Sequence, residues 1–262
     1  MRFGRILLAL MLIVPISAPG LAADSHGLLT DILADHVKDG MVNYRALCKD
    51  ARLGQYIQQL ARTNPDRISS EEDRLAFWIN AYNAYTLKII CDNYPLKSIQ
   101  NLNPRGLRKA FAKTVWDKPL ATVNNRPTTL NTIEHKIIRT RFKDPRIHFA
   151  LVCAAKSCPP LRSEAYEGDK LDEQLDDQGR LFLTDSSKNR FDTGGRAAQI
   201  SKIFSWFAKD FGGENAAVLK FIAEFLPEDA ADKVKANPGA WTTRYTDYDW
   251  SLNEQPAGRR TG

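Results

Sequence analysis

The chain has 262 residues, of which 43% are hydrophobic and 26% are charged, and its formal net charge is +6. This length is enough for one sizeable core and favours one domain over two. The basic surplus is small and dispersed, so it does not predict a nucleic-acid partner.

The first 22 residues have the pattern of a cleavable secretory signal peptide. Arg2 and Arg5 form a short positive region, which is followed by an apolar run over 6–16 and then by small residues. That run is shorter than the about 20 residues that a helix needs to span a bilayer. We therefore expect a signal peptide over 1–22 and a single globular domain over 23–262. This domain should be periplasmic or secreted and have no stable membrane span.

The first half of the remaining chain predicts three helices. Apolar residues recur at helical spacing over 28–37 and 53–61, on either side of a short strand over 41–44. The strongest helical pattern covers 71–91, where apolar and aromatic residues leave almost no polar face. Such a helix must be buried nearly all round, at the centre of the core.

The ends of this central helix carry their own signals. Ser69 and Glu72 have the spacing of a capping box at its N-terminus. Cys91, at its other end, has the pattern of a small buried hydrophobic residue. Within the helix, Asn80 and Asn83 lie on one face, and buried amides must find hydrogen-bond partners.

The second half predicts short strands among further helices. Asn124-Asn125 suits the turn of a hairpin that pairs 114–116 with 121–123. The apolar run over 146–153 predicts a buried strand. Helices are expected over 132–141, 171–183, 199–207 and 216–226, and a final strand over 245–252. The fold class is therefore α+β, a helix-rich single domain around a small, mostly antiparallel sheet.

Reactive side chains concentrate in the segment 146–161. It holds His148, Cys153, Ser157 and Cys158, and His135 lies on the helix before it. A nucleophilic cysteine needs a base within hydrogen-bond reach to hold it as thiolate. The small residues after Cys153 would leave backbone N–H groups free to stabilise an oxyanion.

Several of these segments resemble a known family. From about residue 73 to residue 252 the chain is similar to the family called domain of unknown function 547. The resemblance rests on AFWINAYNA at 76–84, TIEH at 132–135, DPRIHFALVC at 144–153, SCPPL at 157–161, and the segments 204–211 and 248–253. It implies a papain-like or transglutaminase-like thiol fold, circularly permuted because His135 precedes Cys153.

The resemblance also implies a catalytic set of Cys153, His135 and Glu134. Cys153 would attack and His135 would move the proton. Glu134 and His135 are consecutive on a helix, and consecutive side chains do not face each other. Asn80 or Asn83 is therefore an alternative group to orient the imidazole.

His148, Ser157 and Cys158 are expected to support the site or bind substrate. A zinc site built from His135, His148, Cys153 and Cys158 would have suitable ligand types, but their spacing matches no standard zinc motif. We expect no metal and no cofactor.

The leading hypothesis is an exported thiol hydrolase or acyltransferase that acts on an amide or ester bond in a small molecule or peptide. A different class also fits, a non-catalytic envelope binding module with a structural Cys153–Cys158 disulfide. A redox-responsive or metal-responsive protein built on the same cysteines is the third hypothesis. The substrate itself has no signature in the sequence.

Overall fold

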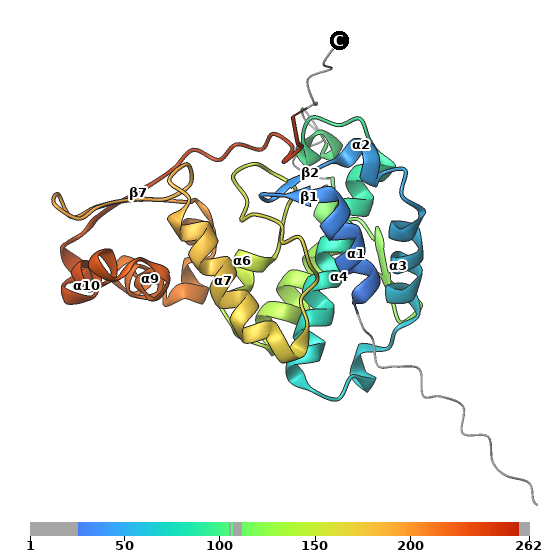
Figure 1. Ribbon diagram of the computed structural model, residues 1–262, viewed down its shortest axis with the longest axis horizontal. Helices are drawn as coiled ribbons and strands as arrows, with labels where there is room; N and C mark the ends of the chain where they lie inside the picture. Colours follow the sequence, from blue (N-terminus) through green and yellow to red (C-terminus); the bar gives the residue numbers. More distant parts are fainter. Residues whose placement is uncertain (1–25, 105, 107–111, 257–262) are drawn as a thin grey trace, which may run out of the picture.

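The structure is a computed structural model that describes residues 26–104, 106 and 112–256. The expected signal peptide over 1–22 lies outside these residues. Helices dominate, and the strands form three small sheets, so the α+β prediction is confirmed (Figure 1). Within the described residues, no helix combines the length and the apolar character that a membrane span requires.

The first half of the structure is a helical layer around one central helix (Figure 1). Its elements are α1 (Gly27–His36), the hairpin of β1 (Val37–Lys38) and β2 (Met41–Val42), α2 (Tyr44–Leu47), α3 (Ala51–Arg62) and α4 (Glu71–Asp92). The predicted helices of this half are all present. The strand predicted over 41–44 is shorter, because Asn43 instead caps α2 and accepts a hydrogen bond from the Ala46 N–H at 3.2 Å.

The central helix α4 is buried as its pattern predicts. Ile79 and Ile89 are 0% and 2% exposed, and even the large indole of Trp78 is only 7% exposed. Its cap is one residue later than expected, because the Ser70 hydroxyl, and not that of Ser69, accepts the Asp73 N–H at 2.9 Å.

A disulfide joins the end of α4 to the segment after α2. Cys48 and Cys91 are bonded, and they lie 43 positions apart in the chain. The interpretation of Cys91 as an unpaired buried hydrophobic residue was therefore wrong. Its spacing within an apolar helix carries no information about a partner that lies in another element.

The middle of the chain differs from its prediction in two places. The turn at Asn124 and Asn125 is correct, and both residues have the positive φ values, 51° and 56°, that such a turn requires. However, β3 (Ala121–Val123) pairs with the strand after the turn, β4 (Arg126–Thr128), and not with 114–116. The single helix expected over 132–141 is a π-helix, η5 (Thr132–Ile138), followed by the short α5 (Arg139–Arg141).

The buried strand predicted over 146–153 is wrong. Residues Ile147–Ala150 form the single-turn helix α6, and the chain becomes extended only from Leu151. All four residues of α6 are buried, including the polar His148, so the sequence shows no helical period. A continuous apolar run does not distinguish a buried strand from a buried turn of helix.

The second half adds a small sheet and four more helices. These elements are α7 (Leu171–Thr184), β5 (Arg190–Asp192), β6 (Ala197–Ile200), α8 (Ile203–Trp206), α9 (Asn215–Ile222), α10 (Glu228–Ala236) and β7 (Thr242–Tyr245). β6 pairs antiparallel with β5 and parallel with β7. The helix expected over 199–207 begins only at Ile203, since its first residues belong to β6. The final strand ends where it was expected to begin, at Tyr245.

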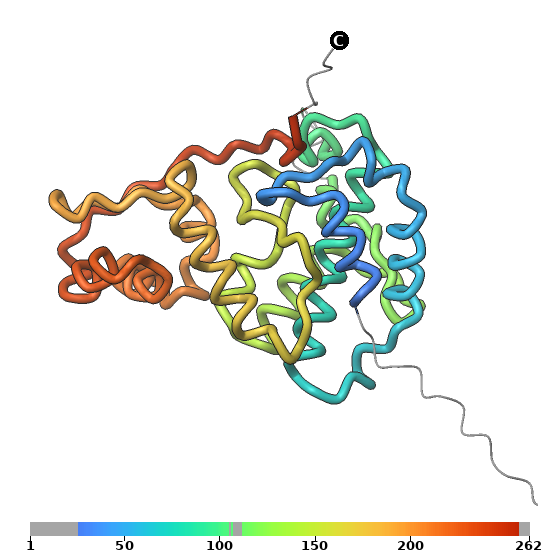
Figure 2. The backbone as a smooth tube through the Cα atoms, in the orientation of Figure 1, coloured from blue at the N-terminus to red at the C-terminus, as the bar shows by residue number. Residues whose placement is uncertain are grey.

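After β7 the chain returns across the molecule to the N-terminal half (Figure 2). Leu252 forms an antiparallel bridge with Ala155, and Glu254 forms a parallel bridge with Val42. The Tyr44 hydroxyl donates to the side-chain oxygen of Asn253 at 2.8 Å in the interior. The last described residues therefore connect elements from both ends of the sequence.

Candidate functional site

A pocket of about 200 Å³ lies where the two halves of the chain meet. Its lining brings together residues of α4, η5, α8, the segment after α6 and the returning C-terminal segment. These residues are Tyr82, Trp116, Asn131, Glu134, His135, His148, Leu151, Cys153, Cys158, Ile203, Trp206, Phe207, Tyr248 and Trp250. All three residues of the proposed catalytic set therefore line one pocket.

The central helix fixes the position of Cys153. The Asn83 amide of α4 donates to the Ala150 carbonyl at 2.9 Å and accepts from the Val152 N–H at 2.9 Å. These two bonds hold the end of α6 and the residue before Cys153. Because both ends of the amide are occupied, Asn83 does not orient His135.

Asn80 has the same kind of role one turn earlier. Its side chain donates to the Tyr166 carbonyl at 2.7 Å and accepts from the Tyr166 N–H at 2.9 Å. Neither asparagine therefore serves as the orienting group that was considered as an alternative to Glu134. Both are buried structural amides that satisfy backbone groups.

Cys153 and Cys158 form a close pair at the pocket. Their sulfur atoms are 2.7 Å apart, and Cys153 is half-buried whereas Cys158 is buried. The Tyr248 hydroxyl lies 3.2 Å from the Cys153 sulfur. Cys153 follows α6 and does not begin a helix, so no helix N-terminus lowers its pKa.

The two thiols differ in which protonation state their surroundings favour. The Cys153 N–H donates to the Cys158 sulfur at 2.9 Å. Burial opposes the charged form of Cys158, but hydrogen bonds from Cys153, Tyr248 and the backbone outweigh it and lower the pKa. The hydrogen bond with Cys158 and burial raise the pKa of Cys153 well above its usual range. The pair therefore favours a thiolate on Cys158 and a thiol on Cys153.

The backbone after Cys153 is bonded to the C-terminal segment. The Lys156 N–H donates to the Ser251 carbonyl at 2.9 Å, and the Ser157 N–H donates to the Asp249 carbonyl at 3.2 Å. The Ser157 hydroxyl accepts the Asp249 N–H at 2.8 Å, and Ser157 is not among the lining residues. These two N–H groups are thus unavailable to an oxyanion, whereas the Ala155 N–H, also expected to be free, is directed at the thiol pair.

Among the titratable groups of η5, Glu134 has the most strongly shifted pKa. Its side chain is 10% exposed. Burial raises the pKa of Glu134 from 4.5 to about 7, against the opposing effects of a Tyr82 hydrogen bond and the Arg139 charge. A buried carboxyl that titrates near neutral pH is suited to proton transfer.

His135 contacts an arginine and not a cysteine. Arg139, one turn further along, donates from Nη1 to the His135 Nδ1 at 2.9 Å, while the Glu134 carboxylate is 3.9 Å from the same nitrogen. A guanidinium can only donate, so Nδ1 must be the acceptor and the proton of the neutral ring is on Nε2. Burial and then the Arg139 charge lower the pKa of His135, which favours that neutral form.

Asp210 fixes the orientation of Arg139, which donates to His135. Its two carboxylate oxygens accept from Nε and Nη2 of Arg139 at 2.6 and 2.9 Å. Burial would raise the pKa of Asp210, but the hydrogen bonds from Arg139 and His148 outweigh it and lower the pKa. Asp210 is therefore a fixed anion that orients the Arg139 fork.

His148 is a buried partner of the same anion. Its Nε2 lies 2.7 Å from an Asp210 oxygen, and its ring stacks on Phe207 with centroids 4.0 Å apart. Burial lowers the pKa of His148 to about 4, so the ring is neutral and donates to Asp210. His148 thus supports the site through Asp210.

No group of three or more histidine, cysteine or acidic side chains with metal-binding geometry occurs within residues 26–104, 106 and 112–256. The four ligands of the zinc alternative all line the pocket, but two of them are already engaged. His135 is bonded to Arg139 and His148 to Asp210.

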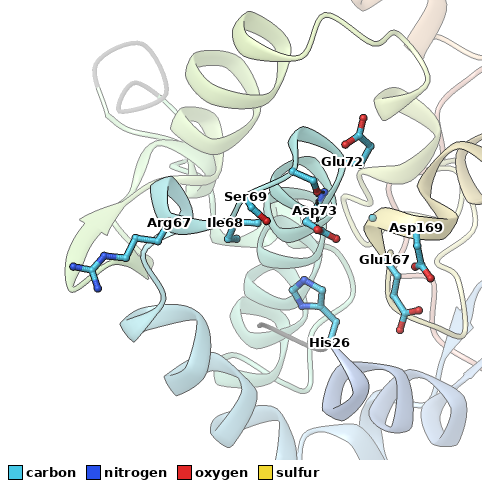
Figure 3. Close-up of a pocket in the computed structure, with 10 residues that line it drawn as sticks. His26, Arg67, Ile68, Ser69, Glu72, Asp73, Glu167 and Asp169 are labelled. Atoms are coloured by element: carbon cyan, nitrogen blue, oxygen red, sulfur yellow. Dashed lines mark hydrogen bonds between the residues drawn. The ribbon is translucent and has the colours of Figure 1, made fainter. Parts of the chain in front are cut away.

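A larger cavity of about 670 Å³ lies at the N-terminal end of α4 (Figure 3). Glu72, Asp73, Glu167 and Asp169 surround it, while Arg67 points away from these carboxylates. Its histidine, His26, is bonded to the Tyr56 hydroxyl at 2.7 Å. The cavity lining contains no cysteine, so the cysteine pocket is the better candidate for chemistry.

Residues 65–183 match the family described as "Protein of unknown function, DUF547". Over these residues, the match confirms the family that the motifs predicted. The match contains α4, η5 and both cysteines of the pair, whereas the late segments 204–211 and 248–253 lie beyond it. No curated protein and no solved structure matches the chain.

Sequence reasoning missed three residues of the site. Arg139 follows His135 at the i,i+4 spacing of a helix face, and that signal was present. Asp210 and Tyr248 lie in segments whose positions depend on the fold of the second half. Nothing local in their sequence connects them to Cys153.

Proposed function

We propose that the protein is a thiol enzyme that transfers or hydrolyses an acyl group through Cys153. The observation that carries the proposal is the single pocket that Cys153, Glu134 and His135 line together. Cys153 is the nucleophile because it is the more exposed of the two paired thiols. The papain-like or transglutaminase-like ancestry that the sequence suggests is part of this proposal.

In this proposal Cys158 activates the nucleophile. The Cys153 thiol gives its proton to the adjacent Cys158 thiolate, 2.7 Å away, as its sulfur attacks the carbonyl carbon. The carbonyl oxygen becomes an oxyanion. The Tyr248 hydroxyl, 3.2 Å from the attacking sulfur, is close enough to donate to it.

His135 has a different role from the base that its sequence context suggested. With Arg139 on Nδ1, the imidazole presents an N–H on Nε2 and acts as a neutral donor to the substrate. Glu134, protonated in part at neutral pH, gives a proton to the leaving amine or alcohol. Water or an acceptor then attacks the thioester and gives its proton to Glu134. As the acyl group leaves, the released Cys153 sulfur takes its proton back from Cys158.

We also propose that the protein works outside the cytoplasm, in the periplasm or as a secreted protein. The pattern of residues 1–22 supports export, and the Cys48–Cys91 disulfide suits an oxidising compartment. N-terminal sequencing of the protein from cell fractions tests this directly. A cytoplasmic protein that retains Met1 would contradict it.

A second candidate function is reversible dithiol–disulfide chemistry at Cys153 and Cys158. The sulfur separation of 2.7 Å favours it, because little movement is needed to form the bond. The oxidised pair would lose the Cys153 nucleophile, so the two functions make opposite demands on the redox state.

One experiment separates the two functions. The reduced full chain is incubated with an activated aryl ester, and the intact mass is followed for an acyl adduct. We expect an adduct on Cys153 that is absent from Cys153→Ala and slower to form in Cys158→Ala, which retains the nucleophile without its proton acceptor. No adduct, together with rapid reduction of a model protein disulfide, would replace acyl transfer by the redox function.

A further inference from the structure

The walls of the cysteine pocket are mostly aromatic rings. Trp206 packs against Tyr248 and Trp250 with centroids 4.8 and 5.9 Å apart, and Trp116 meets Trp250 at 6.0 Å. Phe207 closes the side next to the histidines. Rings in such offset and tilted contacts offer flat apolar faces to a ligand.

The size of the pocket limits what can enter. Its volume is about 200 Å³. An engineered apolar cavity of about 150 Å³ holds one benzene molecule. The cysteine pocket therefore has room for one six-membered ring, or a short acyl chain, with a carbonyl group attached, and not for two amino-acid residues.

The charges around the pocket are already neutralised by each other. No lysine or arginine is among the described residues that line it. Arg139, just behind His135, uses Nε and Nη2 on Asp210 and Nη1 on His135. A ligand carboxylate would therefore find no free cation to pair with.

The titratable groups that line the pocket also favour an uncharged ligand. Burial raises the pKa of Glu134 to about 7 and lowers the pKa of His148 to about 4, and both changes favour the uncharged form. Asp210, the fixed anion, is bonded to Arg139 and His148 and does not line the pocket.

Of the described lining groups, Cys158 is the one on which the thiol pair favours an anion, but its sulfur is buried and already accepts hydrogen bonds from Cys153 and Tyr248. A ligand ammonium group would thus lose its hydration without an anion free to pair with it.

We propose that the pocket binds an uncharged aryl or short acyl group about the size of one six-membered ring. The inference deepens the proposed acyl transfer, on which it rests for the position of the reacting bond near Cys153. The indole of Trp206 is 47% exposed although it packs on two rings, so it forms the rim over which the ligand enters. The leaving group of the substrate then projects past Trp206 into solvent.

The test compares ligands of one size and different charge. Benzamide, benzoate and benzylammonium are titrated against the reduced full chain at pH 6, where Glu134 is mostly neutral, with binding followed by ligand-observed NMR. We expect benzamide to bind and each charged ligand to bind at least about tenfold more weakly, because the pocket offers neither charge a partner that is still free. Trp206→Ala should weaken benzamide about three- to tenfold through the lost ring contact.

The matched control is Leu181→Ala, which removes a side chain that is 51% exposed on α7 and outside the pocket. It should leave benzamide binding unchanged. Benzoate or benzylammonium binding as tightly as benzamide, or a Trp206→Ala protein that binds normally, would overturn the inference.

The same titration on Cys153→Ala separates this inference from the proposed function. Benzamide binding that persists there, while wild type forms no acyl adduct with an aryl ester, would leave the ligand class standing and remove the acyl transfer. Adducts that form equally well from neutral and charged esters would do the reverse.

Discussion

Replacing Glu134 by glutamine should stabilise the protein relative to wild type, and this stabilisation should be larger at alkaline pH than at acidic pH. Burial raises the pKa of Glu134 from 4.5 to about 7 in the folded protein. As the pH rises through this range, the unfolded chain loses its proton first, so wild-type folding becomes less favourable. Glutamine has nearly the same shape and stays neutral, so the variant does not incur this loss.

The size of the expected change in the free energy of unfolding follows from the pKa shift of Glu134. A difference of about 2.5 pKa values corresponds to about 3 kcal/mol in full, of which about 2–3 kcal/mol falls between pH 5 and pH 8. The free energy of unfolding should be measured in urea at pH 5, 6, 7 and 8 for both proteins. The stability of Glu134→Gln relative to wild type should increase by that amount across the series.

Comparing the variant with wild type at each pH cancels the contributions of the other titrating groups. Burial lowers the pKa values of His26 and His148 to about 4, but these histidines are present in both proteins and cancel in the difference. Glu72→Gln, at an exposed position of α4, is the matched control for the substitution itself. A Glu134→Gln difference that is constant from pH 5 to pH 8 would refute the reasoning.

Three further changes test other parts of the structure. Replacing Cys48 and Cys91 together by alanine should lower the free energy of unfolding by up to about 4 kcal/mol, as expected for a loop closed over 43 positions, and the loss should vanish against reduced wild type. Asn83→Ala leaves two buried backbone groups without partners and should cost about 2–5 kcal/mol in urea unfolding, whereas a loss below 1 kcal/mol would contradict its bridging role. Arg139→Gln removes a nearby positive charge and should raise the pKa of His135 in an NMR titration, and an unchanged or lower value would disprove the contact.

The parts of the fold that the sequence predicted are those with a strong local pattern. The apolar surface of α4 specified a central helix, and Asn124-Asn125 specified a turn. The cap of α4 was displaced because Ser69 and Ser70 are each followed three positions later by an acidic residue. Only the folded backbone decides between them.

The errors arise where tertiary contacts decide the conformation. The segment that forms α6 is buried at every position, His148 included, so its sequence shows no amphipathic period that would predict a helix. β4 contains Pro127, and as an edge strand of a two-stranded hairpin it tolerates the missing N–H.

The candidate site likewise has a part that local sequence patterns predict and a part that depends on tertiary contacts. Cys153, Glu134 and His135 were found because reactive residue types and a family resemblance indicate them locally. Their roles depend on Arg139 and on residues distant in sequence, which no local pattern could supply. The thiolate preference of Cys158 likewise depends on a backbone N–H that points at its sulfur.

The returning C-terminal segment makes the site a late product of synthesis. Tyr248 reaches the thiol pair from a segment 95 positions after Cys153, and Leu252 pairs with Ala155 in the loop that carries the cysteines. A nascent chain still held by the ribosome beyond Tyr245 would already contain both thiols and the helices that hold them, but not the hydroxyl beside Cys153. A proteolytic cut between Tyr245 and Tyr248 would likewise separate that hydroxyl from the segment that carries the thiols.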